Sequence, residues 1–589
     1  MKILNIILTA GVIVALAATT LYNFSETAAS LLIWPYFIAI PLFLILYRFG
    51  KWINKIGRQK QLDQGWGKAS SLPFDIELSN IKSAYEAAEF SEGARTAEVD
   101  EGSWNDLNLD EVYAHVNHCL SSPGYYQLYK SLKNPLIDKG KLANRESMIA
   151  FFEEEAVKTG RGACDLLGRA LLSLRTSEHL DILKLIDRKN DSGRLFSVCI
   201  VMRALAILSI AGLFFLKIEM AILFIFLIFI GNQILSNILK KRTKGSVPAL
   251  SGLLRLIRAS EEITGHEFAC EAVTNLKNSL KEETSKLHRV KTFTRFLYGK
   301  TIALDNPVDV LWMYIDIFFL IEAIAFYRSL NFIHSHRSEA FRVFALIGEL
   351  DGLRSIVSLR NGFSGEQTYC QPVFNIGQRF IKTKEIYHPL LFGPVKNDIE
   401  LDTPGLLLTG ANMAGKSTFL RTIGINSILA QSILTVFADS FESDIFIIRS
   451  SIDKQDSIMS GKSLYYAEAE RVGNILKLAS RSELTVLCLF DELLSGTNTE
   501  EREAAVTSII RGAAAMNTLC LAATHDRRVV DEFSGSFQLR HFTYHFDDSG
   551  LVFDYKLRAG RVKNGNAIRL LEYLGYPEKI VYDAYELIK

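Results

Sequence analysis

An eight-residue pattern that ends in a lysine and a serine constrains this chain more than any other feature. Residues 410–417 read GANMAGKS and match the full GxxxxGK[ST] pattern. The apolar run 406–409 before it predicts a strand, and residues 418–434 after it predict a helix. Glycines let backbone N–H groups curl around phosphate oxygens, and the helix N-terminus adds the positive end of its dipole. In this context the pattern predicts a nucleotide-binding loop, the alternative being a turn without a ligand.

Polar side chains in and beyond this loop match the remaining chemistry of phosphoryl transfer. Lys416 would neutralise the β and γ phosphates, and the Ser417 hydroxyl would ligate Mg²⁺. The apolar strand 486–490 ends in Asp491 and Glu492, and the carboxyl end of a parallel strand lies beside such a loop. Asp491 is then placed to hold Mg²⁺ and Glu492 to orient or deprotonate the attacking water. The alternative is an acidic pair that only stabilises a helix dipole.

A histidine follows another predicted strand. His525 lies three residues beyond the apolar run 519–522. At the end of a strand its ring could hydrogen-bond the γ-phosphate or the lytic water, whereas a lone histidine could equally be structural. His525 therefore joins Lys416 and Glu492 as a candidate catalytic residue.

Charge and cysteine content narrow the class of protein. Lys plus Arg number 66 and Asp plus Glu 65, a formal net charge of +1, which excludes a strongly basic nucleic-acid scaffold and an acidic disordered tail. The seven cysteines are odd in number and form no CxxC pair, so we expect neither a disulfide framework nor a zinc site. The bulk of the protein is expected to be reduced and intracellular.

Four apolar segments predict two membrane hairpins. They are residues 3–22, 31–49, 196–216 and 218–239, each near the length that spans a bilayer as a helix. The first could instead be a signal peptide, and the last two a buried hairpin of a soluble core. Basic residues flank both hairpins, so the positive-inside rule predicts a multi-pass protein of the cytoplasmic (inner) membrane with its large domains in the cytoplasm. Residues 308–326 contain three carboxylates, and we expect a buried soluble helix there.

The rest of the chain changes character near residue 380. Residues 72–186 and 253–298 show helical periodicity. After Phe380, short apolar runs alternate with amphipathic helices, which predicts an α/β domain with a largely parallel sheet. The predicted strands are residues 405–409, 445–449, 485–490, 518–522 and 551–557. We divide the chain into a transmembrane hairpin (1–50), a helical core in two parts (51–195 and 240–380) around a second hairpin (196–239), and an α/β domain (381–589).

Taken together, these motifs resemble those of the MutS family, whose ATPases share the ABC-type nucleotide-binding plan. The family's phosphate loop, TGPNMGGKST, appears as TGANMAGKST over residues 409–418, and its DELGRGTST appears as DELLSGTNT over 491–499. Its ATH corresponds to residues 523–525. Its signature G-x-S-x-F-x-x-E is matched by Gly461, Ser463 and Glu468, with Tyr465 in place of Phe. Weaker similarity covers 104–136, 350–372, 387–390 and 395–398, and 565–584 resembles the closing helix-turn-helix that packs across the family's dimer.

The resemblance implies a fold and a site. The fold is an ABC-type P-loop α/β domain like MutS domain V, preceded by an all-α MutS-like core that here carries predicted transmembrane helices. The ligands are ATP and Mg²⁺, and Ser463 is expected to reach the γ-phosphate of the opposite subunit in a homodimer. The expected ATP contacts are Gly410, Ala411, Asn412, Met413, Ala414, Gly415, Lys416, Ser417, Thr418 and Ser463.

Two functions are consistent with these features. The first is a membrane-tethered, dimeric MutS-like ATP hydrolase coupled to DNA binding, related to mismatch repair but without the family's N-terminal mismatch-reading domain, whose place the membrane spans take. The second is a mechanochemical membrane ATPase that acts on a protein or membrane partner with no role on DNA. The near-zero net charge gives no independent footprint of DNA binding.

Overall fold

The structure is a computed structural model that describes residues 34–73, 75–88, 97–187, 192–243, 247–294, 307–365, 367–402, 404–411, 414–453, 464–495, 498–547, 550–561 and 567–587. The chain divides after Gly65 into two units. In the first, α2 (Trp34–Gly65) is a single helix that contains most of the second predicted span and its basic flank. The first predicted span, residues 3–22, lies outside the described residues.

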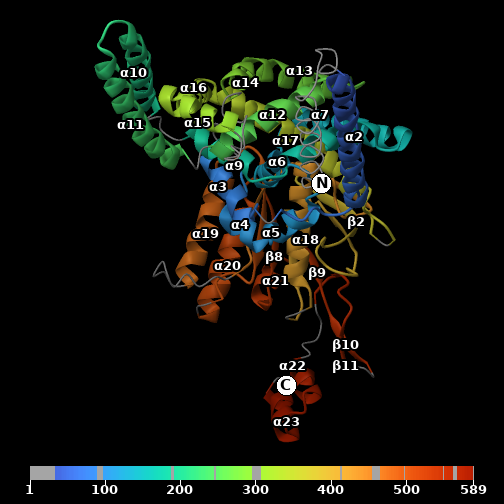
Figure 1. Cartoon of the computed structure of the whole chain (residues 1–589). Helices are drawn as coiled ribbons and strands as arrows, with labels where there is room; N and C mark the ends of the chain where they lie inside the picture. The colour runs from blue at the N-terminus through green and yellow to red at the C-terminus, as the bar shows by residue number, and fades with distance from the viewer. Residues whose placement is uncertain are drawn as a thin grey trace. The chain divides into compact units, whose positions relative to one another are not determined.

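The helical part of the second unit is organised around one long helix (Figure 1). This helix, α17 (Arg337–Arg360), packs against α6, α7, α8, α12 and α13, and also contacts the preceding helix, α16 (Ile321–Ser335). Its apolar side chains are fully buried along the face that includes Val343, Phe344, Ile347 and Leu350. The other helices here are α3 (Leu78–Ala88), α4 (Glu101–Asp106), α5 (Leu109–Val116), α6 (Ser122–Lys133), α7 (Lys139–Thr159), α8 (Gly162–Leu171), α9 (Glu178–Asp187), α12 (Val247–Thr264), α13 (Glu271–Lys286) and α14 (His288–Thr294). The predicted helical character of this region is confirmed.

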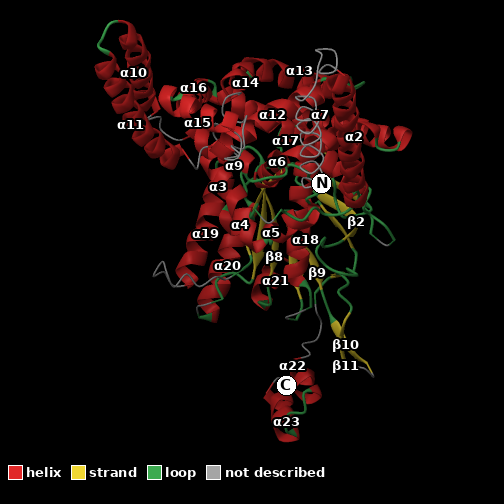
Figure 2. Ribbon diagram, in the orientation of Figure 1, coloured by secondary structure: helices red, strands yellow, loops and turns green. Residues whose placement is uncertain are grey.

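Two long apolar helices interrupt this region as an antiparallel pair (Figure 2). They are α10 (Ser192–Ala211) and α11 (Ile218–Thr243), which pack against each other and against α15 (Pro307–Phe319) and α16 (Ile321–Ser335). Residues 194–214 and 218–241 are the two helical stretches in the described chain that are long and apolar enough to cross a membrane. Most of these residues are not buried. A buried soluble hairpin, the alternative considered above, would instead hide its apolar side chains.

The segment expected to form one buried helix over residues 308–326 forms two, so that prediction was wrong. Here α15 (Pro307–Phe319) and α16 (Ile321–Ser335) are separated by Leu320, whose φ of 51° lies in the left-handed region. The Asp316 carboxylate accepts the backbone N–H of Glu322 at 2.7 Å and so satisfies a donor in the first turn of α16. Burial is also incomplete, because Leu311 and Tyr314 are exposed.

The α/β domain is built on a six-stranded sheet of order β12-β9-β4-β8-β7-β6. Its strands are β4 (Gly405–Thr409), β6 (Phe446–Ser451), β7 (Thr485–Asp491), β8 (Thr518–Ala523), β9 (Gln538–His541) and β12 (Arg558–Ala559). All neighbours pair in parallel except β12 with β9, which confirms the predicted parallel sheet. The strand predicted over 551–557 is shorter and lies outside this sheet: β11 (Gly550–Phe553) pairs with β10 (Tyr544–Asp547) as a separate antiparallel hairpin, and β9 takes the place beside β4.

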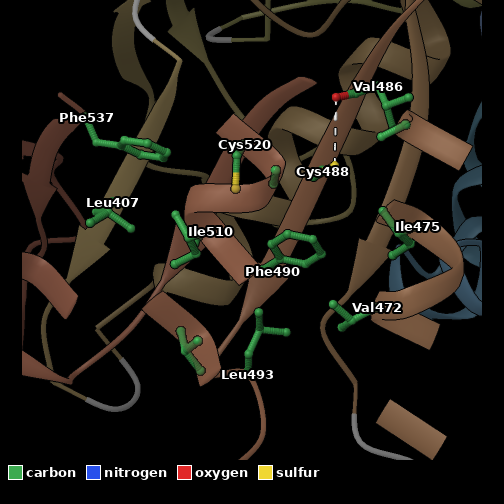
Figure 3. Packing of buried hydrophobic residues seen from close by; sticks show 14 of the residues in the cluster. Leu407, Val472, Ile475, Val486, Cys488, Phe490, Leu493, Ile510, Cys520 and Phe537 are labelled. Atoms are coloured by element: carbon green, nitrogen blue, oxygen red, sulfur yellow. Dashed lines mark hydrogen bonds between the residues drawn. The ribbon is translucent and has the colours of Figure 1, made fainter. Parts of the chain in front are cut away.

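Helices cover both faces of this sheet. Alternate residues of the central strands, such as Leu407, Val486 and Phe490, pack with side chains of α19 (Leu464–Ala479), α20 (Thr499–Ala514) and α21 (Arg527–Phe533) in the cluster of Figure 3. The opposite face meets α18 (Lys416–Ile433), where a Cβ on Gly424 would lie 2.6 Å from the Leu489 side chain. Because successive side chains of a strand point to opposite faces of the sheet, these strands contribute alternate side chains to the packing on each face.

A smaller sheet and two terminal helices complete the described chain. The sheet has the order β1-β5-β2-β3, with β1 (Val373–Phe374), β2 (Ile381–Ile386), β3 (Asn397–Leu401) and β5 (Ser440–Ser443). Because this sheet includes β1, it begins before residue 381, the predicted start of the α/β domain. The terminal helices are α22 (Ala567–Tyr573) and α23 (Glu578–Leu587), which pack on each other.

Candidate nucleotide-binding site

The phosphate loop follows β4 through backbone that favours glycine. Gly410 has a φ of 144°, and a Cβ there would lie 2.5 Å from the Phe542 carbonyl oxygen, so a larger residue would clash with backbone. Gly415 has a φ of 108° and forms the N-cap of α18. The loop therefore delivers the chain to the N-terminus of α18, where backbone N–H groups favour an anion. Three other predicted ATP contacts in or next to this loop are described, namely Ala411, Ala414 and Thr418. The remaining two, Asn412 and Met413, lie outside the described residues.

Lys416 is the first residue of α18 and is buried. Its ammonium donates to the carbonyl oxygens of Gly410 at 2.9 Å and Ala411 at 3.1 Å, so it folds back over the loop. The Glu492 carboxylate lies 3.8 Å away. Burial lowers the pKa of Lys416, and the charges of Glu492 and Asp491 partly offset that shift. This ammonium is held where it can neutralise phosphate charge.

Asp491 ends β7 opposite Ala523 of β8 and points toward Ser417. Burial raises the pKa of its carboxyl, and a hydrogen bond from the Ser417 side chain opposes that rise. Its Oδ1 is buried and has no hydrogen-bond partner among the described residues. A hydroxyl beside an unsatisfied carboxylate oxygen is the donor set that Mg²⁺ takes together with phosphate oxygens and water. Asp491 and Ser417 therefore fit the predicted metal role.

Glu492 and His525 meet at the same edge of the sheet. Glu492 has a φ of 45°, and its N–H donates to the Ala523 carbonyl at 3.0 Å, which turns the chain sharply after β7. Its Oε1 lies 3.6 Å from His525 Nδ1. The structure therefore brings together Lys416, Ser417, Asp491, Glu492 and His525, as their positions at the ends of parallel strands predict.

An ion pair behind His525 was not predicted. Asp526 lies 3.8 Å from His525 Nε2 and accepts a hydrogen bond from Arg502 of α20 at 2.7 Å, with both charged side chains largely buried. It ties the start of α20 to the segment that carries His525. Arg502 and Asp526 are 24 residues apart in sequence, and no local pattern marks them as partners.

The predicted signature segment is described only in part. Ser463 and Gly461 lie outside the described residues. Glu468, on α19, is buried, and its Oε1 accepts the N–H of Leu494 at 2.8 Å. The end of the signature is thus fixed to the turn that follows Asp491 and Glu492.

Comparison with known proteins agrees with this geometry. Residues 406–589 match the family model for MutS domain V. The C-terminal part of this chain is therefore similar to MutS domain V. The matched residues contain all but the first residue of β4, the phosphate loop and every side chain described at this site. Proteins of the MutS family are ATPases, so the match agrees with the chemistry of the assembled residues.

Several proteins of the MutS family are similar to part of this chain, and each similarity covers only part of the relative. Endonuclease MutS2 of Bacillus velezensis is 30% identical over 263 residues, which is 44% of this chain and 33% of the relative. DNA mismatch repair protein MutS of Thermus thermophilus is 30% identical over 258 residues, 43% of this chain and 30% of the relative. Probable DNA mismatch repair protein Msh6 of Drosophila melanogaster is 31% identical over 263 residues, 41% of this chain and 22% of the relative. This chain matches a third or less of their length.

Proposed function

We propose that this chain is a Mg²⁺-dependent ATP hydrolase that works as a homodimer. The observation that carries the proposal is the meeting of Lys416, Asp491, Glu492 and His525 beside the N-terminus of α18. Such a set combines a phosphate-binding ammonium, a metal-binding acid and a base within one edge of a parallel sheet. ATP rather than GTP is proposed from the MutS relationship.

Each side chain has a role that follows from its position. Lys416 would leave the carbonyl oxygens of Gly410 and Ala411 for the β and γ phosphates. Bound Mg²⁺ would neutralise charge on the phosphates, held by Ser417 and Asp491. Glu492 would accept the proton of the attacking water, while His525, 3.6 Å from its Oε1, would orient the water or the γ-phosphate. Removal of the charge on Glu492 therefore separates binding from hydrolysis.

The homodimer is supported by the helical pair at the C-terminal end of the described chain. Exposed apolar side chains there include Tyr573, Leu574, Tyr576, Ile580 and Tyr582. A contiguous set of exposed large apolar residues marks an interaction surface, and a second copy of this chain is the partner we propose. In that dimer Ser463 would complete the site of the opposite subunit, as the signature resemblance implies.

The membrane anchor is proposed from the exposed faces of α10 and α11. Their exposed residues include Val201, Leu208, Ile222, Phe224 and Leu227. Exposure of such residues to water on many sides of a hairpin is unfavourable, and insertion into lipid lowers the free energy. Arg194 and Lys240 lie at the same end of this antiparallel pair, which by the positive-inside rule supports the proposal that this end and the α/β domain face the cytoplasm. The earlier predicted spans, 3–22 and 31–49, would add a second hairpin in the inner membrane.

A role on DNA is proposed from the names of the relatives, two of which are DNA mismatch repair proteins. The test is ATP hydrolysis by detergent-solubilised full-length protein with and without duplex, mismatched and branched DNA. Stimulation by one DNA structure supports a DNA-coupled ATPase. A rate indifferent to all of them would keep the ATPase and favour the alternative, a mechanochemical enzyme that acts on a protein or membrane partner.

The anchor needs a separate measurement. Residues 66–589, which lack the other proposed hairpin, should float with liposomes, and the double variant Leu208→Glu with Leu227→Glu of the same residues should lose much of that recovery. Val157→Glu changes an exposed apolar residue of α7 and is the matched control, expected to float like the unsubstituted residues 66–589. Equal flotation of all three proteins would refute the assignment of α10 and α11.

A further inference from the structure

A single buried carboxylate joins the helical region to the last parallel strand of the α/β domain. Asp106, the final residue of α4, is 1% exposed. It accepts hydrogen bonds from the Ser450 hydroxyl at 2.8 Å, the Ile452 N–H at 2.8 Å and the Asp453 N–H at 3.1 Å. The neighbouring Ser103 hydroxyl accepts the N–H of Ser450 at 2.9 Å. The end of β6 is therefore fixed to α4 as well as to β7.

The same carboxylate also binds the helix that follows. Arg471 of α19 donates to both oxygens of Asp106, at 3.3 and 2.8 Å. The approach is close, since a Cβ on Gly102 would lie 2.6 Å from the Arg471 guanidinium. Asp106 thus holds residues 450–453 and Arg471, which stand on either side of residues 454–463 in the sequence. Those ten residues contain Gly461 and Ser463 of the signature.

A third contact connects α4 with the phosphate-loop helix. The Arg421 side chain of α18 donates to the backbone carbonyl of Asp106 at 2.7 Å and pairs with Asp453. Arg421 stands one turn after Lys416 and Ser417, and its charge helps to lower the pKa of Asp491 against the effect of burial. The short helix α4 therefore contacts both α18, which follows the phosphate loop, and α19, which carries the end of the signature.

We infer that Asp106 is a positioning residue for the end of β6 and for α19, and that through these two elements the helical region affects how each subunit acts on its partner's ATP. The inference rests on the proposed function, in which Ser463 acts across the dimer. The physical reason is that a buried acid with five donors fixes its neighbours tightly, and loss of its charge leaves Arg471 without its carboxylate. Substrate atoms do not touch Asp106, so its effect is on placement.

The test uses Asp106→Asn in the full-length protein, alone and mixed with Lys416→Ala. Alone, Asp106→Asn should lower kcat about tenfold or more, because a small misplacement of catalytic groups is costly, and should leave the Kd for ATP within about twofold. In a mixed dimer, the Asp106→Asn subunit keeps its phosphate loop and receives an intact signature segment from the Lys416→Ala subunit. Equal mixing should therefore restore about a quarter of the wild-type rate, since half the dimers are mixed and each has one complete site.

Two further variants keep the test decisive. Asp110→Asn is the matched control, because Asp110 accepts hydrogen bonds from Lys82 and Trp104 within the helical region and should leave kcat unchanged. If Asp106→Asn unfolds, Arg471→Gln removes the α19 contact from a partly exposed position and should show the same complementation. A mixture no faster than the sum of its two parents, or an Asp106→Asn rate equal to that of the wild type, overturns the inference. A wild type without ATPase activity instead overturns the proposed function.

Discussion

Replacement of Glu492 by glutamine should separate nucleotide binding from hydrolysis. The change keeps the size of a side chain whose Oε1 lies 3.8 Å from Lys416 Nζ and 3.6 Å from His525 Nδ1. It removes the proton acceptor that we place beside the attacking water. General bases contribute roughly 10²–10⁴-fold to rate, so kcat should fall by that factor, which is about 3–5 kcal/mol in the activation barrier.

The affinity for ATP should be kept or increased. At 3.8 Å the attraction between Glu492 and Lys416 is at most about 4 kcal/mol at an effective dielectric constant of about 20, and water at the partly exposed Glu492 reduces it. Without that attraction, Lys416 is released toward phosphate, and a negative charge beside the triphosphate disappears. The Kd for ATP should therefore stay within about threefold of the wild type or decrease, and a closed dimer should accumulate.

The assay pairs phosphate release with equilibrium binding of a fluorescent ATP analogue, and light scattering records the dimer. Glu501→Gln, an exposed glutamate in the first turn of α20, is the control and should leave all three measurements unchanged. Wild-type kcat in Glu492→Gln would refute the assignment of the base. Loss of binding together with hydrolysis would show that Glu492 supports the loop instead.

Three more predictions follow from the site. Lys416→Ala should weaken ATP binding at least tenfold, because the buried ammonium is lost while the backbone donors remain; near-normal affinity measured by calorimetry would contradict its role. Ser463→Ala should reduce hydrolysis, and mixing it with Lys416→Ala should restore part of the rate, whereas no recovery would exclude a site shared between subunits. Asp491→Asn should raise the stability of the nucleotide-free protein by about 1 kcal/mol, because burial raises the pKa of this carboxyl and its ionised form is unfavourable at neutral pH. The same variant should abolish the thermal shift caused by Mg²⁺ with ATP. An unchanged Mg²⁺-dependent shift would exclude the metal role.

The parts of this protein that depend on the local backbone could be predicted from its sequence. The phosphate loop requires glycines at positive φ before a helix, and Gly410 and Gly415 have such values. Strands β4, β7 and β8 are continuous apolar runs because a parallel strand is buried on both faces, and their predicted bounds agree with the structure within one residue. The parallel arrangement then brought Asp491, Glu492 and His525 to the loop, so motif spacing was sufficient for the central site.

Tertiary structure alone decided which distant residues support that site. Asp106 accepts donors from residues more than 340 positions away, and no sequence pattern marks such a partner. The position of β9 beside β4 was missed for a similar reason, since its four half-buried residues lack the apolar run of a central strand. The break at Leu320 depends on a cap that Asp316 supplies only once the chain has turned. Local chemistry fixes loops and central strands, whereas buried polar contacts between regions exist only after packing has brought their partners together.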